Sequence, residues 1–364
     1  MSKAAELAKW GEVSTNGQVS GRRNIVINGA MNVAQRSASV TGLGATAGYH
    51  TLDRFRASLT DTAGRFTMSQ TADGPSGFAN CLKLDCTTAD ASIAATEQLT
   101  ILQRIEGQDL QQFKKGTSDA EYFTVSFYVK ANASATYVLE LFDNDNSRQI
   151  SKLFNVTNSW SRVVLTFPPD TTGAFDDDNA TSLTLSFQLH LGSNFTSGTL
   201  NTAAWASNTN ANRAAGIDSF FSSTDRTFFL TGVQMEVGSV ATPFEHRSFG
   251  EELALCQRYY EVLGRGPNSY TMTFANMPIK ISPTNAFSQG HAYKTMKRAA
   301  PTVVVYSRND NSGKVSTMAT GADEGNNWAI NSGGVNGFHG VQRDGGTHSA
   351  GEGLEYGFEA DAEL

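Results

Sequence analysis

The alternation of apolar and polar side chains between residues 120 and 240 constrains the fold of this chain more than any other feature. Over residues 183–191, Leu and Phe at the odd positions alternate with Thr, Ser, Gln and His at the even ones. Residues 123–129, 163–167 and 229–237 repeat this period of two. Successive side chains of a β-strand point to opposite faces, so the pattern predicts half-buried antiparallel strands. Many such strands joined by polar links, without long helices, predict an all-β fold with a jelly-roll β-sandwich.

The same alternation predicts the core of the sandwich. Its apolar members on the inward faces are Phe127, Val129, Leu185, Phe187, Leu189 and Val233. Nearer the N-terminus, residues 25–27 form a compact apolar run that predicts a further strand, and Asn28-Gly29 is a strong turn signal.

One helix is expected after the sandwich. Ser248 and Glu251 have the spacing of a capping box, with Ser248 as the N-cap. Apolar residues then follow helical spacing from Leu253 to Tyr260, and Gly264 fits the C-terminal stop.

The chain therefore divides into three predicted parts. Residues 1–23 form a separate N-terminal segment, and residues 24–250 form the jelly-roll domain. Residues 251–364 contain the helix and a second, smaller β-sandwich domain, in which residues 303–306 and 354–360 have the composition of strands.

Charge and apolar patterning exclude several functional classes. The net charge is −7, whereas a nucleic-acid binder normally presents a basic face, so we expect no nucleic-acid partner. No apolar run approaches the roughly 20 residues that span a bilayer, so we expect no membrane insertion. Residues 1–10 predict a short amphipathic helix without the apolar centre of a signal peptide, which predicts folding in the cytosol of the producing cell. The three cysteines are expected to be buried free thiols.

Acidic clusters raise the questions of metal binding and catalysis. Asp143 and Asp145 could supply oxygen ligands to a structural calcium ion, but a polar hairpin loop is the alternative, because the glycine and distal glutamate of an EF-hand loop are absent. Residues 176–178 carry the same ambiguity. Glycosidases use paired carboxylates, although Asp runs in loops are typically solvated turn formers. No acid/base pair, nucleophile set or cofactor fingerprint is evident, so we expect no enzyme activity and no cofactor other than that calcium ion.

The second domain offers the candidate binding residues. Residues 307–353 are rich in Gly, Asn, Ser and Asp and predict loops, and loops on a rigid β-scaffold are where binding residues collect. The side chains there most able to stack on or hydrogen-bond a sugar are Arg308, Trp328, Phe338, His339 and Arg343. The alternative for the Trp and the Phe is that they anchor the loops in a core. In the first domain a second platform is conceivable, formed by Tyr128, His190 and Trp205.

Several stretches of sequence are informative when taken in order. The first stretch is Asn-Ile-Val-Ile-Asn-Gly-Ala-Met-Asn-Val-Ala-Gln-Arg. From the first stretch to the last, the series spans about 340 residues. They are residues 24–36, 50–55, 106–110, 122–130, 228–236, 238–247, 251–260, 301–306 and 358–364. This series resembles a module of bacteriophage tail-fibre proteins, and the module is similar to the jelly-roll carbohydrate-binding modules of secreted hydrolases.

The resemblance implies a tail-fibre or receptor-binding protein of a virion, often trimeric, that meets the host surface. We therefore expect a homotrimer that is assembled in the host cytoplasm, attached to tail or baseplate proteins through residues 1–23, and able to bind host surface polysaccharide through the second domain. The alternatives are a head-decorating or other structural virion protein, a stand-alone lectin-like protein, and a depolymerase or glycosidase.

Overall fold

The chain folds into two compact β-rich units in the computed structural model. The structure describes residue 3 and residues 23–264, 285–287, 290–318, 320–325, 327–344 and 354–364. The first unit comprises residues 1–252 with Leu364, and the second comprises residues 253–363. None of the helices in the described ranges is long and apolar enough to cross a bilayer. The segment predicted for docking, residues 1–23, lies almost wholly outside the described residues.

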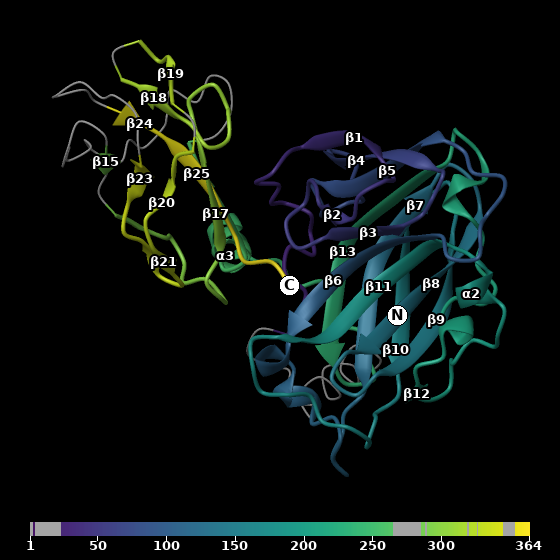
Figure 1. Ribbon diagram of the computed structural model, residues 1–364. Coiled ribbons are helices and arrows are strands. Elements are labelled where there is room, and N and C mark those ends of the chain that lie inside the picture. The colour runs from purple at the N-terminus through teal and green to yellow at the C-terminus, as the bar shows by residue number, and fades with distance from the viewer. Residues whose placement is uncertain are drawn as a thin grey trace. The chain divides into compact units, whose positions relative to one another are not determined.

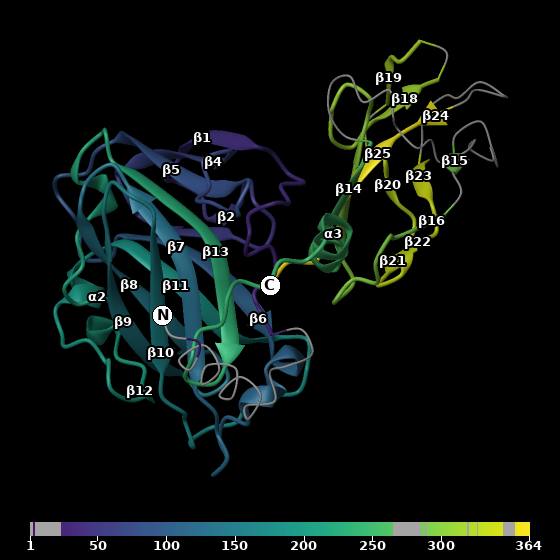
Figure 2. The same cartoon turned by 180° about the vertical axis from the view of Figure 1, so that it is seen from behind.

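The first unit is a sandwich of two antiparallel sheets (Figure 1). The six-stranded sheet has the order β1 (Ser39–Leu43), β4 (Arg65–Thr71), β5 (Cys81–Thr88), β13 (Thr227–Val237), β7 (Phe123–Ala131) and β10 (Ser161–Phe167). The seven-stranded sheet has the order β12 (Ala206–Ser207), β9 (Arg148–Val156), β8 (Ala135–Asp143), β11 (Thr181–Leu191), β6 (Gln98–Glu106), β3 (Arg56–Thr60) and β2 (Gly48–Tyr49). Figure 1 shows β11 and β8 in front, and Figure 2 shows β13 and β7 in front from the opposite side.

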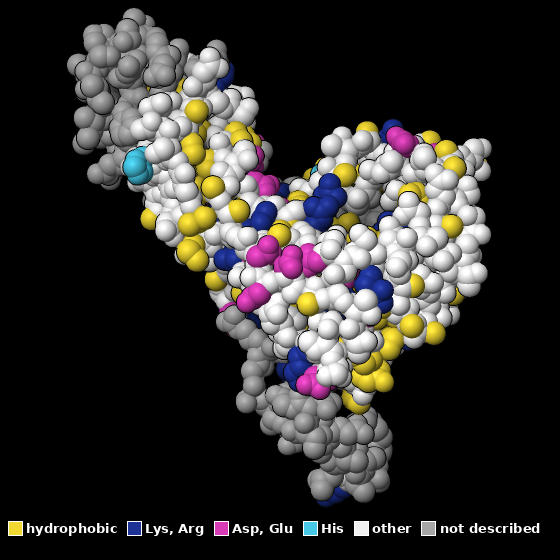
Figure 3. Space-filling model, turned by 60° about the horizontal axis from the view of Figure 1, so that its bottom comes forward, with side chains coloured by type: hydrophobic (Ala, Val, Ile, Leu, Met, Phe, Trp, Pro, Cys, Tyr) yellow, Lys and Arg dark blue, Asp and Glu magenta, His cyan; other side chains and the backbone are white. Residues whose placement is uncertain are grey.

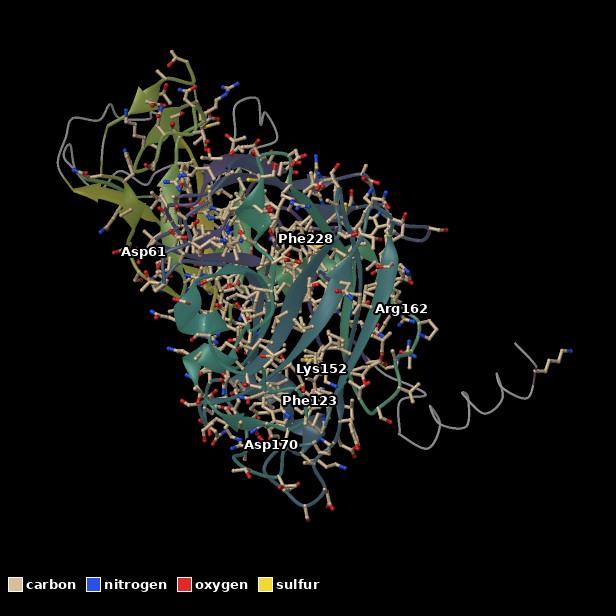
Figure 4. All side chains as sticks on the ribbon, turned by 90° about the vertical axis from the view of Figure 1, so that its right-hand side faces the viewer. Asp61, Phe123, Lys152, Arg162, Asp170 and Phe228 are labelled. Carbon is tan, nitrogen blue, oxygen red and sulfur yellow. The ribbon has the colours of Figure 1, made fainter. Side chains whose placement is uncertain are left out.

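The core between the sheets is formed by the residues that period two predicted. All six predicted core residues are fully buried, which confirms the inward register. The rings of Phe127 and Phe187 meet edge to face at 5.0 Å, one from each sheet. Figure 4 shows Phe123 and Phe228 among the crowded side chains between the sheets, whereas Arg162 lies at the outer edge. The predicted jelly-roll sandwich is therefore the architecture of this unit.

The outer face of the seven-stranded sheet differs from the prediction of half-buried strands. The polar members of β11, including Ser186, Gln188 and His190, are as buried as the apolar ones. Residues 192–219 pack against this face through hydrogen bonds to Glu140, Gln149 and His190, and they contain α2 (Ser193–Thr196) and the 3-10 turn η3 (Asn210–Asn212). A strand shows period two whether its polar face meets solvent or another segment of the chain. The sequence pattern therefore could not reveal that residues 192–219 bury the polar face of β11.

Polar contacts fill the layer between residues 192–219 and the sheet. Arg213 donates to both carboxylate oxygens of Glu140 on β8, at 2.8 and 2.7 Å. The amide of Gln188 donates to the same carboxylate at 2.7 Å and accepts from Thr100 at 2.9 Å. These polar groups thus find partners, which is the condition for burying them, whereas the buried Oε1 of Gln149 and Oγ of Ser151 on β9 have none within the described residues.

The predicted strand at residues 25–27 is not formed. These residues run into a turn at Asn28, whose φ of 61° lies in the left-handed region, as the Asn-Gly signal predicted. The side chain of Asn24 accepts from the N–H groups of Val26 and Met235, so local side-chain hydrogen bonds replace a strand ladder here. Short 3-10 turns complete the first unit at η1 (Gly107–Asp109), η2 (Gln111–Phe113) and η4 (Phe220–Ser222).

The predicted helix is present but shorter than expected. It is α3 (Phe249–Gln257), and the N–H of Glu251 donates to the Ser248 hydroxyl at 3.3 Å, as the capping-box spacing predicted. Tyr260 does not continue it. Instead Tyr260 opens β14 (Tyr260–Leu263), which pairs with β25 (Gly357–Asp361). Aromatic and β-branched residues favour strands, and the partner strand comes from the far end of the chain, so local helical spacing was misleading.

The second unit is a smaller β-unit with its own apolar cluster. β25 also pairs with β17 (Thr302–Tyr306) to form a three-stranded sheet. The remaining strands are β15 (Asn285–Phe287), β16 (His291–Ala292), β18 (Val315–Thr317), β19 (Asp323–Glu324), β20 (Ala329–Ile330), β21 (Gly333–Gly334), β22 (Gly337–Phe338), β23 (Val341–Asp344) and β24 (Leu354–Glu355). The core includes Val305, Trp328, Phe338 and Phe358. The all-β class is confirmed in both units.

Candidate functional site

The five predicted receptor-contact residues do not form one cluster. Phe338 and His339 line the same groove. Trp328 is buried in the core of the second unit. Arg308 is half-buried, with its guanidinium 3.6 Å from the Glu355 carboxylate. Arg343 lies on β23, where its backbone pairs with Ala286, and its side chain is outside the described residues.

The groove in the second unit is an open depression of about 700 Å³. Its floor is the short antiparallel pair of β16 and β22, on which His291 is opposite Phe338. Their rings stack at 5.7 Å with an interplanar angle of 28°. Phe338 is anchored below by Phe358, edge to face at 5.2 Å. The core of the unit holds this aromatic floor rigid, and because Phe338 is only 3% exposed, the half-buried His291 is the more exposed of the two residues.

Polar groups surround this floor. The exposed side chains of Ser332, Asn336 and His339 line the groove, together with a glycine-rich backbone. Burial lowers the pKa of His291, so its ring is uncharged at neutral pH. Its Nε2 atom is buried and has no hydrogen-bond partner within the described residues. No carboxylate lines the groove in the part of the chain that the structure describes.

A second aromatic surface lies on the outer face of the six-stranded sheet. The ring of Phe78 lies 5.2 Å from Tyr128 on β7, 5.0 Å from Phe244 and 5.2 Å from His246. The three carbocyclic rings are half-buried and His246 is exposed. We call these four residues the aromatic face. Tyr128 was a predicted stacking residue, and its neighbours come from two distant loops.

A bulge in β13 makes room for the aromatic face. The register of β13 against β7 shifts between Thr231 and Gln234, and Gly232 there has a φ of +61°. A Cβ atom on Gly232 would lie 2.8 Å from both Phe78 and Tyr128. Only glycine fits this position, because it tolerates positive φ and leaves space for the two rings.

The other two predicted stacking residues of the first unit are not available. His190 is fully buried under residues 192–219, and Trp205 belongs to the core, where its ring lies 5.6 Å from Phe123. The indole N–H of Trp205 donates to the Pro168 carbonyl at 2.9 Å. The predicted platform of Tyr128, His190 and Trp205 is therefore wrong. Residues 192–219 bury His190, and Trp205 is part of the core.

The residues proposed for calcium form an ion-paired hairpin instead. Asp143 is buried, and its Oδ2 atom lies 2.6 Å from the Lys115 ammonium, which is also buried. Its Oδ1 atom accepts from the Asn146 N–H at 3.0 Å. Asp145 points elsewhere and accepts from the Asp176 N–H at 3.0 Å. An ammonium already supplies the positive charge at Asp143, so these residues do not form an oxygen cage for calcium.

Sequence reasoning missed the residues that complete both surfaces. His291, Ser332 and Asn336 join the groove through strand pairs of two residues each, which are too short to show periodicity. Phe78 and Phe244 lie in loops about 165 residues apart, and no local pattern links them. In the second unit, the sequence feature that pointed to the groove was the glycine-rich composition of residues 307–353, which include Ser332 and Asn336 but not His291.

Chemically, the groove provides stacking carbon, hydroxyl, amide and imidazole groups without an acid/base pair. Such a set suits the binding of a neutral polar ligand more than bond cleavage. On the side drawn in Figure 3, neutral polar side chains and backbone predominate, and hydrophobic side chains form scattered patches.

Comparisons with known proteins give structural neighbours and no family. No protein-family model matches the chain, and no curated protein matches it. Among solved structures, the CBM22-1 xylan-binding domain of Paenibacillus barcinonensis Xyn10C aligns with a TM-score of 0.28 and 12% identity, covering 61% of this chain and 100% of that domain. The family 11 carbohydrate-binding module from Clostridium thermocellum, in complex with a β-1,3-1,4-mixed-linked tetrasaccharide, aligns at 0.26 and 11%, covering 52% and 91%.

A phage protein is also among these neighbours. The enzymatically active domain of tailspike protein 4 of bacteriophage CBA120 aligns with a TM-score of 0.30 and 13% identity, covering 59% of this chain. The aligned part amounts to only 21% of that tailspike chain. Identities and TM-scores are low in all three cases, and the sandwich architecture rests on the strand order of the chain itself. The structural neighbours of this chain thus include carbohydrate-binding modules and a phage tailspike.

Proposed function

We propose that this protein is a non-catalytic receptor-binding protein of a phage tail fibre, and that it attaches to host surface polysaccharide through the groove of its second unit. The observation that carries the proposal is the groove itself, where an aromatic floor of His291 and Phe338 is surrounded by Ser332, Asn336 and His339. The sequence also predicted that the second domain binds the receptor. Of the five residues predicted for that contact, two, Phe338 and His339, line the groove.

The groove matches the chemistry of a sugar ring. A pyranose presents a face of C–H groups to an aromatic ring and a rim of hydroxyls to hydrogen-bonding side chains. Neutral imidazole, amide and hydroxyl groups can both donate to and accept from hydroxyls. The absence of carboxylates from the described lining favours binding without hydrolysis.

The place on a virion rests on the sequence resemblance to tail-fibre modules. In that setting residues 1–23 attach to tail or baseplate proteins, and a homotrimer presents three grooves at once. Several weak sites on one rigid particle bind a polymeric surface far more tightly than one site does. A shallow groove of modest affinity is sufficient for adhesion under these conditions.

A triple variant tests the groove. Ser332→Ala, Asn336→Ala and His339→Ala together remove exposed polar groups and leave Phe338 in place. We expect binding to purified host polysaccharide to weaken at least about tenfold, equivalent to roughly 1.4 kcal/mol, with an unchanged melting temperature. Thr302→Ala, an exposed change in the same unit that does not line the groove, serves as the control.

The result also decides between the two surfaces. Undiminished binding by the triple variant rejects the groove. Loss of binding on Tyr128→Ala instead would assign the contact to the aromatic face of the first unit. Release of reducing sugar from the polysaccharide would contradict the non-catalytic assignment.

The virion assignment has its own test. Localisation of the chain in a cryo-EM map of the intact particle separates a tail fibre from a head-decorating or other structural virion protein. Absence from every particle would leave a stand-alone lectin-like protein as the alternative.

A further inference from the structure

Three buried groups with metal-binding atoms meet at one end of the first unit. Asp90 follows β5, Glu97 precedes β6, and His190 lies near the end of β11, opposite Leu99 on β6. Each offers an atom that lies within 4.8 Å of the others. All three residues are at least nine-tenths buried. Neither the predicted calcium site nor either proposed binding surface includes them.

Hydrogen bonding leaves this cluster short of positive charge. Nε2 of His190 lies 3.2 Å from Oε2 of Glu97, and Nδ1 lies 2.8 Å from the Ser219 hydroxyl. Asp90 accepts from the Ser92 N–H through Oδ1, but its buried Oδ2 atom has no hydrogen-bond partner in the described chain. No Lys or Arg in the described ranges forms an ion pair with either carboxylate.

Burial of these groups is unfavourable unless something neutralises them. When the imidazole carries its proton on Nδ1 and donates to Ser219, the Nε2 lone pair faces the two carboxyl groups. A cation at the centre satisfies all three groups at once.

The geometry favours a transition metal over calcium. Bonds of ~2.0–2.2 Å from zinc to nitrogen and oxygen place tetrahedral ligand atoms ~3.3–3.5 Å apart, close to the 3.2 Å between His190 and Glu97. Imidazole is a ligand of zinc and its neighbours, whereas calcium takes oxygen ligands. Ser219, bonded to Nδ1, would fix the orientation of the ring as outer-shell partners of metal-bound histidines do.

We propose that Asp90, Glu97 and His190 bind one divalent transition-metal ion, for which Zn²⁺ is the best-fitting probe. The ion links two segments that are remote in sequence, the loop before β6 and the strand β11, and the turn η4 packs beside them. The N–H of Asp90 already donates to the Phe221 carbonyl at 2.9 Å, and the ring of Phe221 packs against His190 at 5.0 Å. The role of the metal is therefore to hold this end of the sandwich together.

Metal binding to the full-length, untagged protein tests the site. After removal of metals by chelation, calorimetry with Zn²⁺ should give one site per chain and a raised melting temperature, while Ca²⁺ should give neither. Glu97→Gln keeps the shape of the side chain and should abolish the site. Ser219→Ala should weaken Zn²⁺ affinity roughly 10–100-fold, as expected for an outer-shell partner. His246→Ala, an exposed histidine of the same unit, should change nothing.

Several outcomes would overturn the proposal. They are the absence of Zn²⁺ binding, Zn²⁺ binding that survives Glu97→Gln, and equal binding of Ca²⁺. Absorption of the Co²⁺-loaded natural protein covers the case in which Glu97→Gln fails to fold. A tetrahedral or five-coordinate site gives visible bands, and a spectrum of hydrated Co²⁺ alone would show that the two carboxyl groups instead share a proton.

Discussion

Single buried residues of the first unit allow its register and its ion pairs to be tested. Phe187 is fully buried on β11 and contacts Phe127 and Phe154 edge to face, at 5.0 and 6.2 Å between ring centroids. Its burial follows from strand period two, so its energetic role is a direct test of the register. A charged residue, Lys115, is just as buried, and its role follows only from the structure.

Phe187→Ala should lower the free energy of unfolding by about 3–5 kcal/mol, because it removes a ring from a packed core and leaves a cavity. Equilibrium denaturation in urea measures the change. Leu153→Ala on β9 of the same sheet is the control, since Leu153 is 44% exposed and should cost less than about 1 kcal/mol. Similar losses for both variants would contradict the inward assignment of Phe187.

Lys115→Met should destabilise the first unit by about 3–5 kcal/mol, because Asp143 and Asp170 remain buried without their ammonium partner. Lys114→Met is the matched control. Lys114 is mostly exposed and pairs with Glu121 at the surface, where an ion pair contributes only about 0–1 kcal/mol. Thermal and urea unfolding of both variants at neutral pH check this difference.

The ion pair between Lys115 and Asp170 should make the stability of the first unit depend on pH. Burial alone would raise the pKa of Asp170, but hydrogen bonds from Arg148 and the charge of Lys115 outweigh it and lower that pKa. A carboxyl with a lowered folded pKa stabilises the fold fully above its unfolded pKa of about 3.9, and this contribution is lost as the pH falls through the folded value. Stability should therefore fall below about pH 4, and the gap between the natural chain and Lys115→Met should narrow there. A constant gap down to pH 2 would contradict this assignment.

At the level of elements, a bulge and a cover shape the two faces of the sandwich. The bulge at Gly232 lets Phe78 and Tyr128 meet over the six-stranded sheet. On the opposite sheet, residues 192–219 bury a polar layer, so that face offers no exposed surface over β8 and β11. The aromatic face therefore lies on the six-stranded sheet.

Gly232→Ala should destabilise the first unit by more than about 1 kcal/mol, because positive φ is unfavourable for alanine and its Cβ would clash with both rings. Gly250→Ala is the control. Gly250 lies in α3 with open space around its Cα, so alanine should be neutral or slightly stabilising. Thermal unfolding compares the two. A neutral Gly232→Ala would mean that the bulge is not required for the aromatic face.

At the level of the whole molecule, assembly is the main prediction. A short amphipathic segment such as residues 1–10 has too little apolar surface to fold alone, and cyclic homo-oligomers are common. We expect light scattering to give three times the mass of one chain at micromolar concentration. Removal of residues 1–23 should abolish trimers and incorporation into virions while the melting temperature of the sandwich persists. A monomeric full-length chain would contradict this.

The sequence by itself determined the class of fold and the inward faces of its longest strands. Phe127, Phe187 and Val233 could be placed because strand geometry makes every second side chain point the same way, whatever lies across the core. The capped start of α3 was likewise predictable, since a cap depends on residues only three apart.

Only the tertiary structure decided the surfaces. Tyr260 is not part of the helix, because it pairs with a strand from the far end of the chain. His190 is buried, because residues 192–219 pack over its side of the sheet. Phe78 and Phe244 lie together over a bulge, and His190 on β11 lies beside Asp90 and Glu97 of the loop before β6. Sites of this kind depend on contacts between distant parts of the chain, whereas periodicity reports only which face of its own element a residue occupies.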